Sequence, residues 1–120
     1  MQPRILPHDP SNEYYFREGC HITELSNSPE DPDLSVARAR VEPGQTTRWH
    51  LLRLTTERYL ILSGQGRVEI GDLPPHDVGP GDMVLIPPEC PQRITNTGSD
   101  DLIFLALCTP RFSPDCYQEL

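Results

Sequence analysis

The middle of the chain holds an imidazole and a carboxylate close together, His50 and Glu57, and Gln92 follows in a later stretch of the sequence. Imidazole nitrogens and carboxylate oxygens are good ligands for divalent metals, whereas a glutamine amide oxygen is a neutral and poorer donor. A carboxyl held in an apolar cavity also has a raised pKa, which suits it to proton transfer. These residue types therefore indicate either a metal site or a metal-free acid–base pair.

The residues around this pair form two motifs, in residues 44–64 and in residues 81–96. In the first, five residues separate Gly from His, six separate His from Glu, and six separate Glu from Gly. Both motifs resemble those of the cupin superfamily, and the matched positions are Gly44, His50, Glu57, Gly64, Gly81, Pro87 and Asn96. The resemblance implies an all-β fold, a double-stranded β-helix (jelly-roll) barrel of the small single-domain cupin type.

The chain departs from the family at two positions of the metal-ligand set. In the family, three His and one Glu usually bind one divalent metal; here Leu52 stands in place of the second His and Gln92 in place of the third. The resemblance therefore implies weak binding of a divalent metal (Fe, Mn, Ni or Zn) by His50, Glu57 and Gln92. Water or substrate would fill the open positions. If the protein is an enzyme, a metal-dependent dioxygenase or isomerase type is expected.

Two alternatives need no metal. Glu57 beside His50 could act as an acid–base pair for isomerisation or elimination on a small polar molecule. The barrel could equally be a non-catalytic module that binds or senses a small ligand, because cupin-like folds serve many functions. Strand parity places Arg48 on the face of His50 and Tyr59 on that of Glu57, so we expect Arg48, Leu52 and Tyr59 to line the substrate pocket.

Frequent turns and short apolar runs favour strands throughout the chain. Its 14 prolines and 8 glycines break helices and separate short strands. We expect one domain over residues 1–120, made of an arm (1–12), N-terminal strands and a loop (13–33), a barrel core (34–109) and an irregular tail (110–120). The predicted strands span residues 13–17, 20–25, 34–41, 47–54, 57–62, 67–70, 83–86, 92–95 and 102–108, with residues 74–76 in a loop.

Charge and composition exclude several partners. The formal net charge of −8 disfavours nucleic acid and anionic membranes, and no apolar run is long enough for a membrane span. The first residues lack the apolar run of a secretory signal, so we expect a cytoplasmic protein with four free cysteine thiols. Residues 59–62 are apolar on both faces of their predicted strand, which predicts a second covered face and therefore a homodimer.

Overall fold

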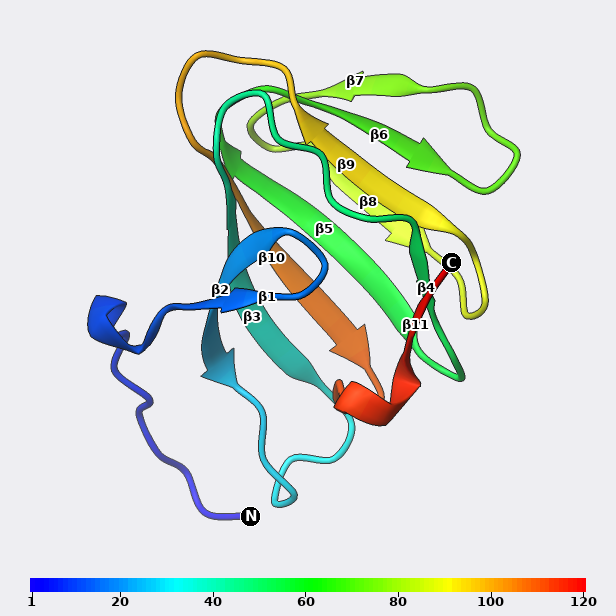
Figure 1. The fold of residues 1–120 in the computed structure, drawn as a ribbon. Coiled ribbons are helices and arrows are strands. Elements are labelled where there is room, and N and C mark those ends of the chain that lie inside the picture. The colour runs from blue at the N-terminus through cyan, green and yellow to red at the C-terminus, as the bar shows by residue number, and fades with distance from the viewer.

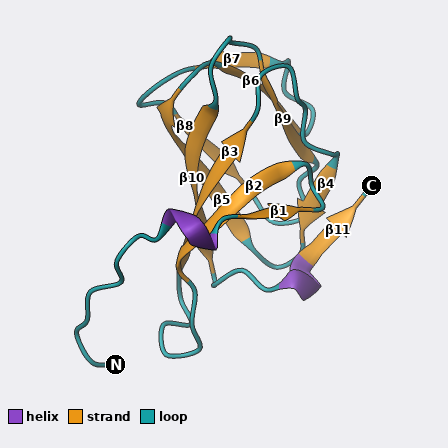
Figure 2. Cartoon of the chain, turned by 60° about the vertical axis from the view of Figure 1, so that its left-hand side comes forward, coloured by secondary structure: helices purple, strands orange, loops and turns teal.

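The computed structural model describes residues 1–120 and contains strands with only two short 3-10 helical turns. Figure 2 shows these turns in purple, one near the N-terminal end and one shortly before the C-terminus. The elements in chain order are η1 (Pro10–Asn12), β1 (Tyr14–Phe16), β2 (Cys20–Ser26), β3 (Ser35–Val41), β4 (His50–Leu52), β5 (Thr56–Ser63), β6 (Gly66–Ile70), β7 (His76–Val78), β8 (Met83–Ile86), β9 (Gln92–Asn96), β10 (Leu102–Thr109), η2 (Pro114–Cys116) and β11 (Tyr117–Glu119).

The strands form two antiparallel sheets that face each other, which confirms the predicted all-β jelly-roll architecture. One sheet has the order β1-β2-β3-β10-β5-β8 and the other has the order β11-β4-β9-β6-β7. Figure 1 shows β10 lying between β3 and β5, although it follows them late in the chain. The two sequence motifs meet in both sheets, because β5 pairs with β8 and β4 pairs with β9.

Alternation along the strands decides which side chains enter this interior. In β5 the inward positions are Glu57, Tyr59 and Ile61, each buried, while their neighbours face outward or are half-buried. In β9 the inward positions are Gln92 and Asn96, with an isoleucine between them. A period of two is the expected pattern for strands that have one face on a core. The same alternation therefore builds the apolar core and directs polar side chains into it.

Three segments differ from their predicted form. The strand expected over residues 47–54 is regular only in β4, because the chain before His50 makes a single bridge at Thr46 and is otherwise irregular. The loop expected at residues 74–76 leads directly into β7, which pairs with β6 from His76 onward. The tail expected to be irregular contains β11, because its prolines precede Tyr117 and leave the last residues free to pair with β4.

The outer face of β5 and β8 is apolar and open. Leu62, Met83 and Leu85 are exposed there, and the N-terminal strands extend the edge of the sheet rather than covering this face. The homodimer expected from the two-sided apolar strand would cover it, and that assembly stays a prediction. No helix of the structure has the length and apolar character needed to cross a membrane.

The side chain of Asn96, a matched motif residue, is expected to stabilise the fold by hydrogen-bonding to the backbone of neighbouring segments. Its amide nitrogen donates to the carbonyl oxygens of Val41 and Asp100, both at 2.8 Å, and its oxygen accepts from the backbone N–H of Gly98 at 2.9 Å. The Asn96→Ala substitution should lower the free energy of unfolding by about 2–4 kcal/mol, because buried backbone groups lose their partners. Urea denaturation measures this, and the exposed Thr97→Ala variant is the control. Equal stability of the two variants would contradict this role.

Candidate functional site

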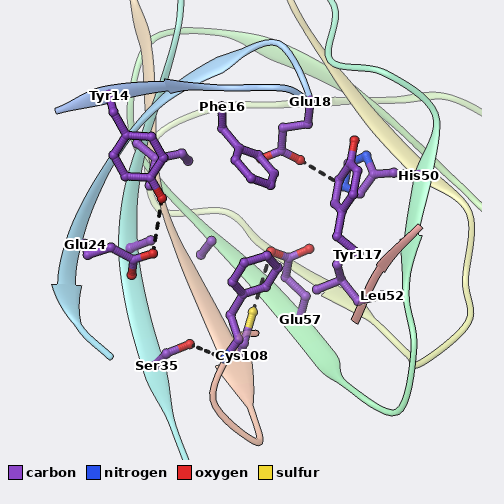
Figure 3. A pocket seen from close by; sticks show the side chains of 14 residues that line it. Tyr14, Phe16, Glu18, Glu24, Ser35, His50, Leu52, Glu57, Cys108 and Tyr117 are labelled. Carbon is purple, nitrogen blue, oxygen red and sulfur yellow. Dashed lines mark hydrogen bonds and ion pairs between the residues drawn. The ribbon is translucent and has the colours of Figure 1, made fainter. Parts of the chain in front are cut away.

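A cavity opens between the two sheets at the end of the barrel where β4 and β11 face β3, β5 and β10. Its volume is about 40 Å³, and part of it is open to solvent. Figure 3 shows the side chains that converge on it from both sheets and from the N-terminal strands. The lining residues are Tyr14, Phe16, Glu18, Ile22, Glu24, Ser35, Ala37, His50, Leu52, Glu57, Ala106, Cys108, Phe112 and Tyr117.

Glu57 enters this cavity from β5 and is only 8 % exposed. Its pairing partner in β10 is Cys108, whose thiol donates to Glu57 Oε2 at 3.7 Å, whereas Glu57 Oε1 has no hydrogen-bond partner. Burial raises the pKa of Glu57 to about 7, and the hydrogen bond from Cys108 opposes the rise. The carboxyl can therefore take up or release a proton near neutral pH.

His50 begins β4 and is held by contacts on both of its ring nitrogens. Its Nδ1 lies 2.6 Å from the carbonyl oxygen of Arg48, and its Nε2 lies 3.1 Å from Glu18 Oε2. The ring also stacks on Tyr117 of β11, with a centroid distance of 5.1 Å. Because a carbonyl oxygen only accepts, Nδ1 carries a proton, and a carboxyl oxygen can contact Nε2 closely only through a second proton. His50 and Glu18 therefore share one proton.

Burial favours the uncharged form of this pair. It lowers the pKa of His50 and raises the pKa of Glu18, the latter against an opposing hydrogen bond from the Cys20 thiol. The favoured arrangement is a protonated Glu18 that donates to a neutral His50. A second exchangeable proton thus lies at the cavity wall, on the Glu18–His50 pair.

Glu18 was not among the residues that the sequence indicated. It lies in the turn between β1 and β2, next to Gly19, whose φ of +102° favours glycine. The carbonyl oxygen of Glu18 accepts from the backbone N–H of Arg48 at 2.7 Å, which fixes the turn against the segment that precedes His50. The only sequence signal was a carboxylate in a turn after a short strand, and its long separation from His50 concealed the pairing.

Gln92 and Tyr59 form the wall behind the cavity. Gln92 pairs with His50 across β9 and β4 and is fully buried. Its Oε1 accepts a hydrogen bond of 2.5 Å from the hydroxyl of Tyr59, while its Nε2 has no partner. Burial raises the pKa of Tyr59 far above its ordinary value, so this hydroxyl remains a donor. Both residues lie near the predicted site, but neither contributes to the cavity surface.

The other two predicted pocket residues have opposite outcomes. Leu52 is buried, lines the cavity and belongs to a small apolar cluster with Cys108 and Tyr117. The placement of Arg48 in the pocket was wrong: its side chain is 62 % exposed and pairs with Glu119 at 3.3 Å. The backbone at Arg48 is not a regular strand, so the alternation that would have aligned it with His50 does not apply there.

The donor set does not fit a divalent metal. No group of three or more His, Cys, Asp or Glu side chains is arranged to hold one. The Nε2 atom of His50 contacts Glu18, the Oε1 atom of Gln92 accepts from Tyr59, and Leu52 has no donor atom. A metal ligand must be deprotonated at the donor atom, and that atom must have a free lone pair facing the ion. Metal binding by His50, Glu57 and Gln92 stays a prediction.

Comparison with solved structures confirms the fold. The chain is similar to KdgF from Halomonas, with a TM-score of 0.79, 16 % identity and coverage of 91 % of this chain and 96 % of that one. It is also similar to Pac13 from Streptomyces, described as a unique nucleoside dehydratase. In that case the TM-score is 0.77 at 18 % identity, with coverage of 95 % and 89 %.

Comparison of sequences shows the family. An uncharacterised protein of Methanocaldococcus jannaschii, MJ1618, is 32 % identical over 108 residues, which are 88 % of this chain and 86 % of that protein. The cupin domain family matches residues 37–108, which include the strands that carry His50, Glu57 and Gln92. The chain therefore belongs to the cupin domain family.

Proposed function

We propose that this cupin is a proton-transfer enzyme, an isomerase or a lyase, that acts on a small polar molecule held in the barrel without using a metal. The observation that carries the proposal is the carboxyl of Glu57. It is buried at the cavity surface, has one oxygen without a partner, and its pKa is raised to about 7. A general base is most effective when its pKa lies near the working pH.

The proton shared by Glu18 and His50 supplies the complementary acid. In an elimination, ionised Glu57 takes the proton of a C–H bond, and the electron pair of that bond forms the new double bond. The neighbouring C–O bond breaks, and the departing hydroxyl leaves as water with the proton that Glu18 and His50 shared. In an isomerisation, Glu57 instead returns its proton to a different carbon of the same molecule. After an elimination, exchange with solvent returns Glu57 to its ionised form and reprotonates the Glu18–His50 pair.

Two features support this reaction class over the other candidates. The two exchangeable protons lie on different sides of the cavity, on β5 and at the β1–β2 turn, so one can leave the ligand while the other arrives. A related fold, Pac13, is a nucleoside dehydratase that has been solved with uridine, and the loss of water is an elimination. The likeness to Pac13 is one of fold, so the assignment depends on Glu57.

A non-catalytic module for binding small ligands is the second candidate. The observation that favours it is the surface of the cavity, where nine of the fourteen lining residues are hydrophobic. Such a surface binds an apolar or aromatic group whether or not a reaction follows. The two candidates differ in one measurable property, because only the enzyme exchanges a proton of its ligand with solvent.

Proton exchange tests the reaction directly. Incubation with uridine and with small polyols and amino alcohols in D₂O should incorporate deuterium at carbon in at least one compound, which NMR detects. The Glu57→Gln variant should lose about 10²–10⁴-fold of the exchange rate, because the amide cannot accept the proton. The exposed Glu30→Gln variant should retain the full rate. Deuterium exchange that persists at the full rate in Glu57→Gln would show that Glu57 is not the general base.

The titration of Glu57 should also appear in the stability of the protein. Its pKa rises from an ordinary 4.5 to about 7 in the folded state. The contribution of protonated Glu57 to the free energy of unfolding is therefore fully present below pH 4.5 and is lost as the pH rises through 7. Between pH 4 and pH 8, wild type should therefore lose about 3 kcal/mol relative to Glu57→Gln. Denaturant unfolding of both proteins measures this difference. Parallel pH profiles would show that the pKa is not raised.

Metal content distinguishes this proposal from the reduced metal site. Wild-type protein purified without a tag or chelator should hold far less than one metal per chain by elemental analysis. Replacing Leu52 and Gln92 by His should raise zinc affinity by more than tenfold, because two imidazole donors are added. Stoichiometric metal in wild type that disappears in both His50→Ala and Glu57→Ala would instead establish the metal site.

A further inference from the structure

The ionisable side chains that line the cavity are mostly acidic. Three carboxyl groups line it, those of Glu18, Glu24 and Glu57, and no lysine or arginine side chain does. The remaining titratable side chain with a basic form is His50, and the proton that it shares with Glu18 gives that pair no net charge. The whole chain also carries a formal net charge of −8. The electrostatic potential in the cavity therefore repels anions.

Aromatic rings form much of the remaining wall. Phe16 packs edge-to-face with Phe112, at a centroid distance of 6.2 Å, and with Tyr117, at 5.2 Å. In Figure 3, Tyr14 lies beside Glu24, on the opposite side of the cavity from Tyr117 and His50. The face of an aromatic ring attracts a cation because of its quadrupole. Arg17 already illustrates this, since its guanidinium lies 4.5 Å from the centroid of Tyr117, although Arg17 does not line the cavity.

The carboxyl of Glu57 adds an unsatisfied acceptor in front of these rings. It points toward the middle of the cavity in Figure 3, and its Oε1 has no hydrogen-bond partner although the side chain is only 8 % exposed. A buried acceptor without a partner is costly, more so once it is ionised. A positively charged ligand supplies both the missing donor and the missing charge. A neutral ligand supplies at most the donor.

We propose that the cavity binds a small organic cation, an amine or quaternary ammonium compound, whose charged group lies between Glu57 and the aromatic wall. This inference rests on the proposed function in placing the ligand at Glu57, and it adds the substrate class. Aromatic rings with nearby carboxylates are the usual means of recognising alkylammonium groups. Carboxylate and phosphate ligands are excluded, because no cationic side chain is present to pair with them.

A matched series of three compounds tests the charge. Choline, its neutral carbon analogue dimethylbutanol and the dimethylbutanoate anion have similar size and differ chiefly in charge, and calorimetry at neutral pH compares their binding. Choline should bind at least about tenfold more tightly than dimethylbutanol, and the anion should not bind. Equal binding of choline and dimethylbutanol, preference for the anion, or no binding of either choline or tetramethylammonium would overturn the proposal.

Variants locate the binding group. Phe112→Leu retains an apolar side chain but loses the π face, and Glu57→Gln retains the shape but loses the charge; each should reduce the preference for choline by about fivefold. The exposed Tyr15→Leu and Glu30→Gln variants are the matched controls and should not change it. Circular dichroism of all four verifies folding. A preference that is unchanged in both cavity variants would overturn the assignment to this cavity.

The two proposals can fail separately. Selective choline binding without deuterium exchange in any compound would retain the cationic ligand and reject the enzyme. Deuterium exchange in a neutral compound, together with no preference for choline, would retain the enzyme and reject the cationic ligand.

Discussion

The burial of the Glu57 carboxyl is the constraint on which the other features of the site depend. A carboxylate removed from water without a cationic partner is strongly disfavoured, so the group shifts its pKa instead of remaining charged. No lysine or arginine lines the cavity to relieve this cost, and the thiol of Cys108 is a weak donor at 3.7 Å. The pKa of Glu57, about 7, therefore follows from the buried position that β5 gives the side chain.

The N-terminal strands complete the site from a distance in sequence. They extend the larger sheet at β3, and their connecting turn carries Glu18 to His50. Two more contacts secure this arrangement: the Glu18 carbonyl accepts from the backbone of Arg48, and Tyr117 of β11 stacks on the His50 ring. Segments outside the two motifs thus decide which form of His50 is favoured. The cupin motifs alone place the imidazole of His50 in the barrel, but they do not determine its protonation state.

Much of the fold could be predicted because it is encoded locally. The alternation in residues 57–62 and the motif glycines, prolines and spacing do not depend on distant contacts. The site was only partly predictable for the opposite reason. Motif spacing brought Glu57 and Leu52 to the cavity, but strand parity misplaced Arg48, because parity presupposes a regular strand. Glu18 and β11 depend on pairings with β4 and its preceding segment, and no local pattern reports such pairings.

The departures at Leu52 and Gln92 are consistent with a proton-transfer site rather than a damaged metal site. A divalent ion bound by Glu57 would occupy the carboxylate oxygens that a general base needs to accept a proton, so the same carboxyl could not serve as a metal ligand and as that base. Leu52 instead adds apolar surface, which favours the raised pKa, and Gln92 is held by Tyr59 in the wall. The Nε2 atom of His50 instead shares a proton with Glu18. Replacing two imidazoles by an apolar side chain and a neutral amide therefore retains the barrel and changes the chemistry available to its remaining carboxyl.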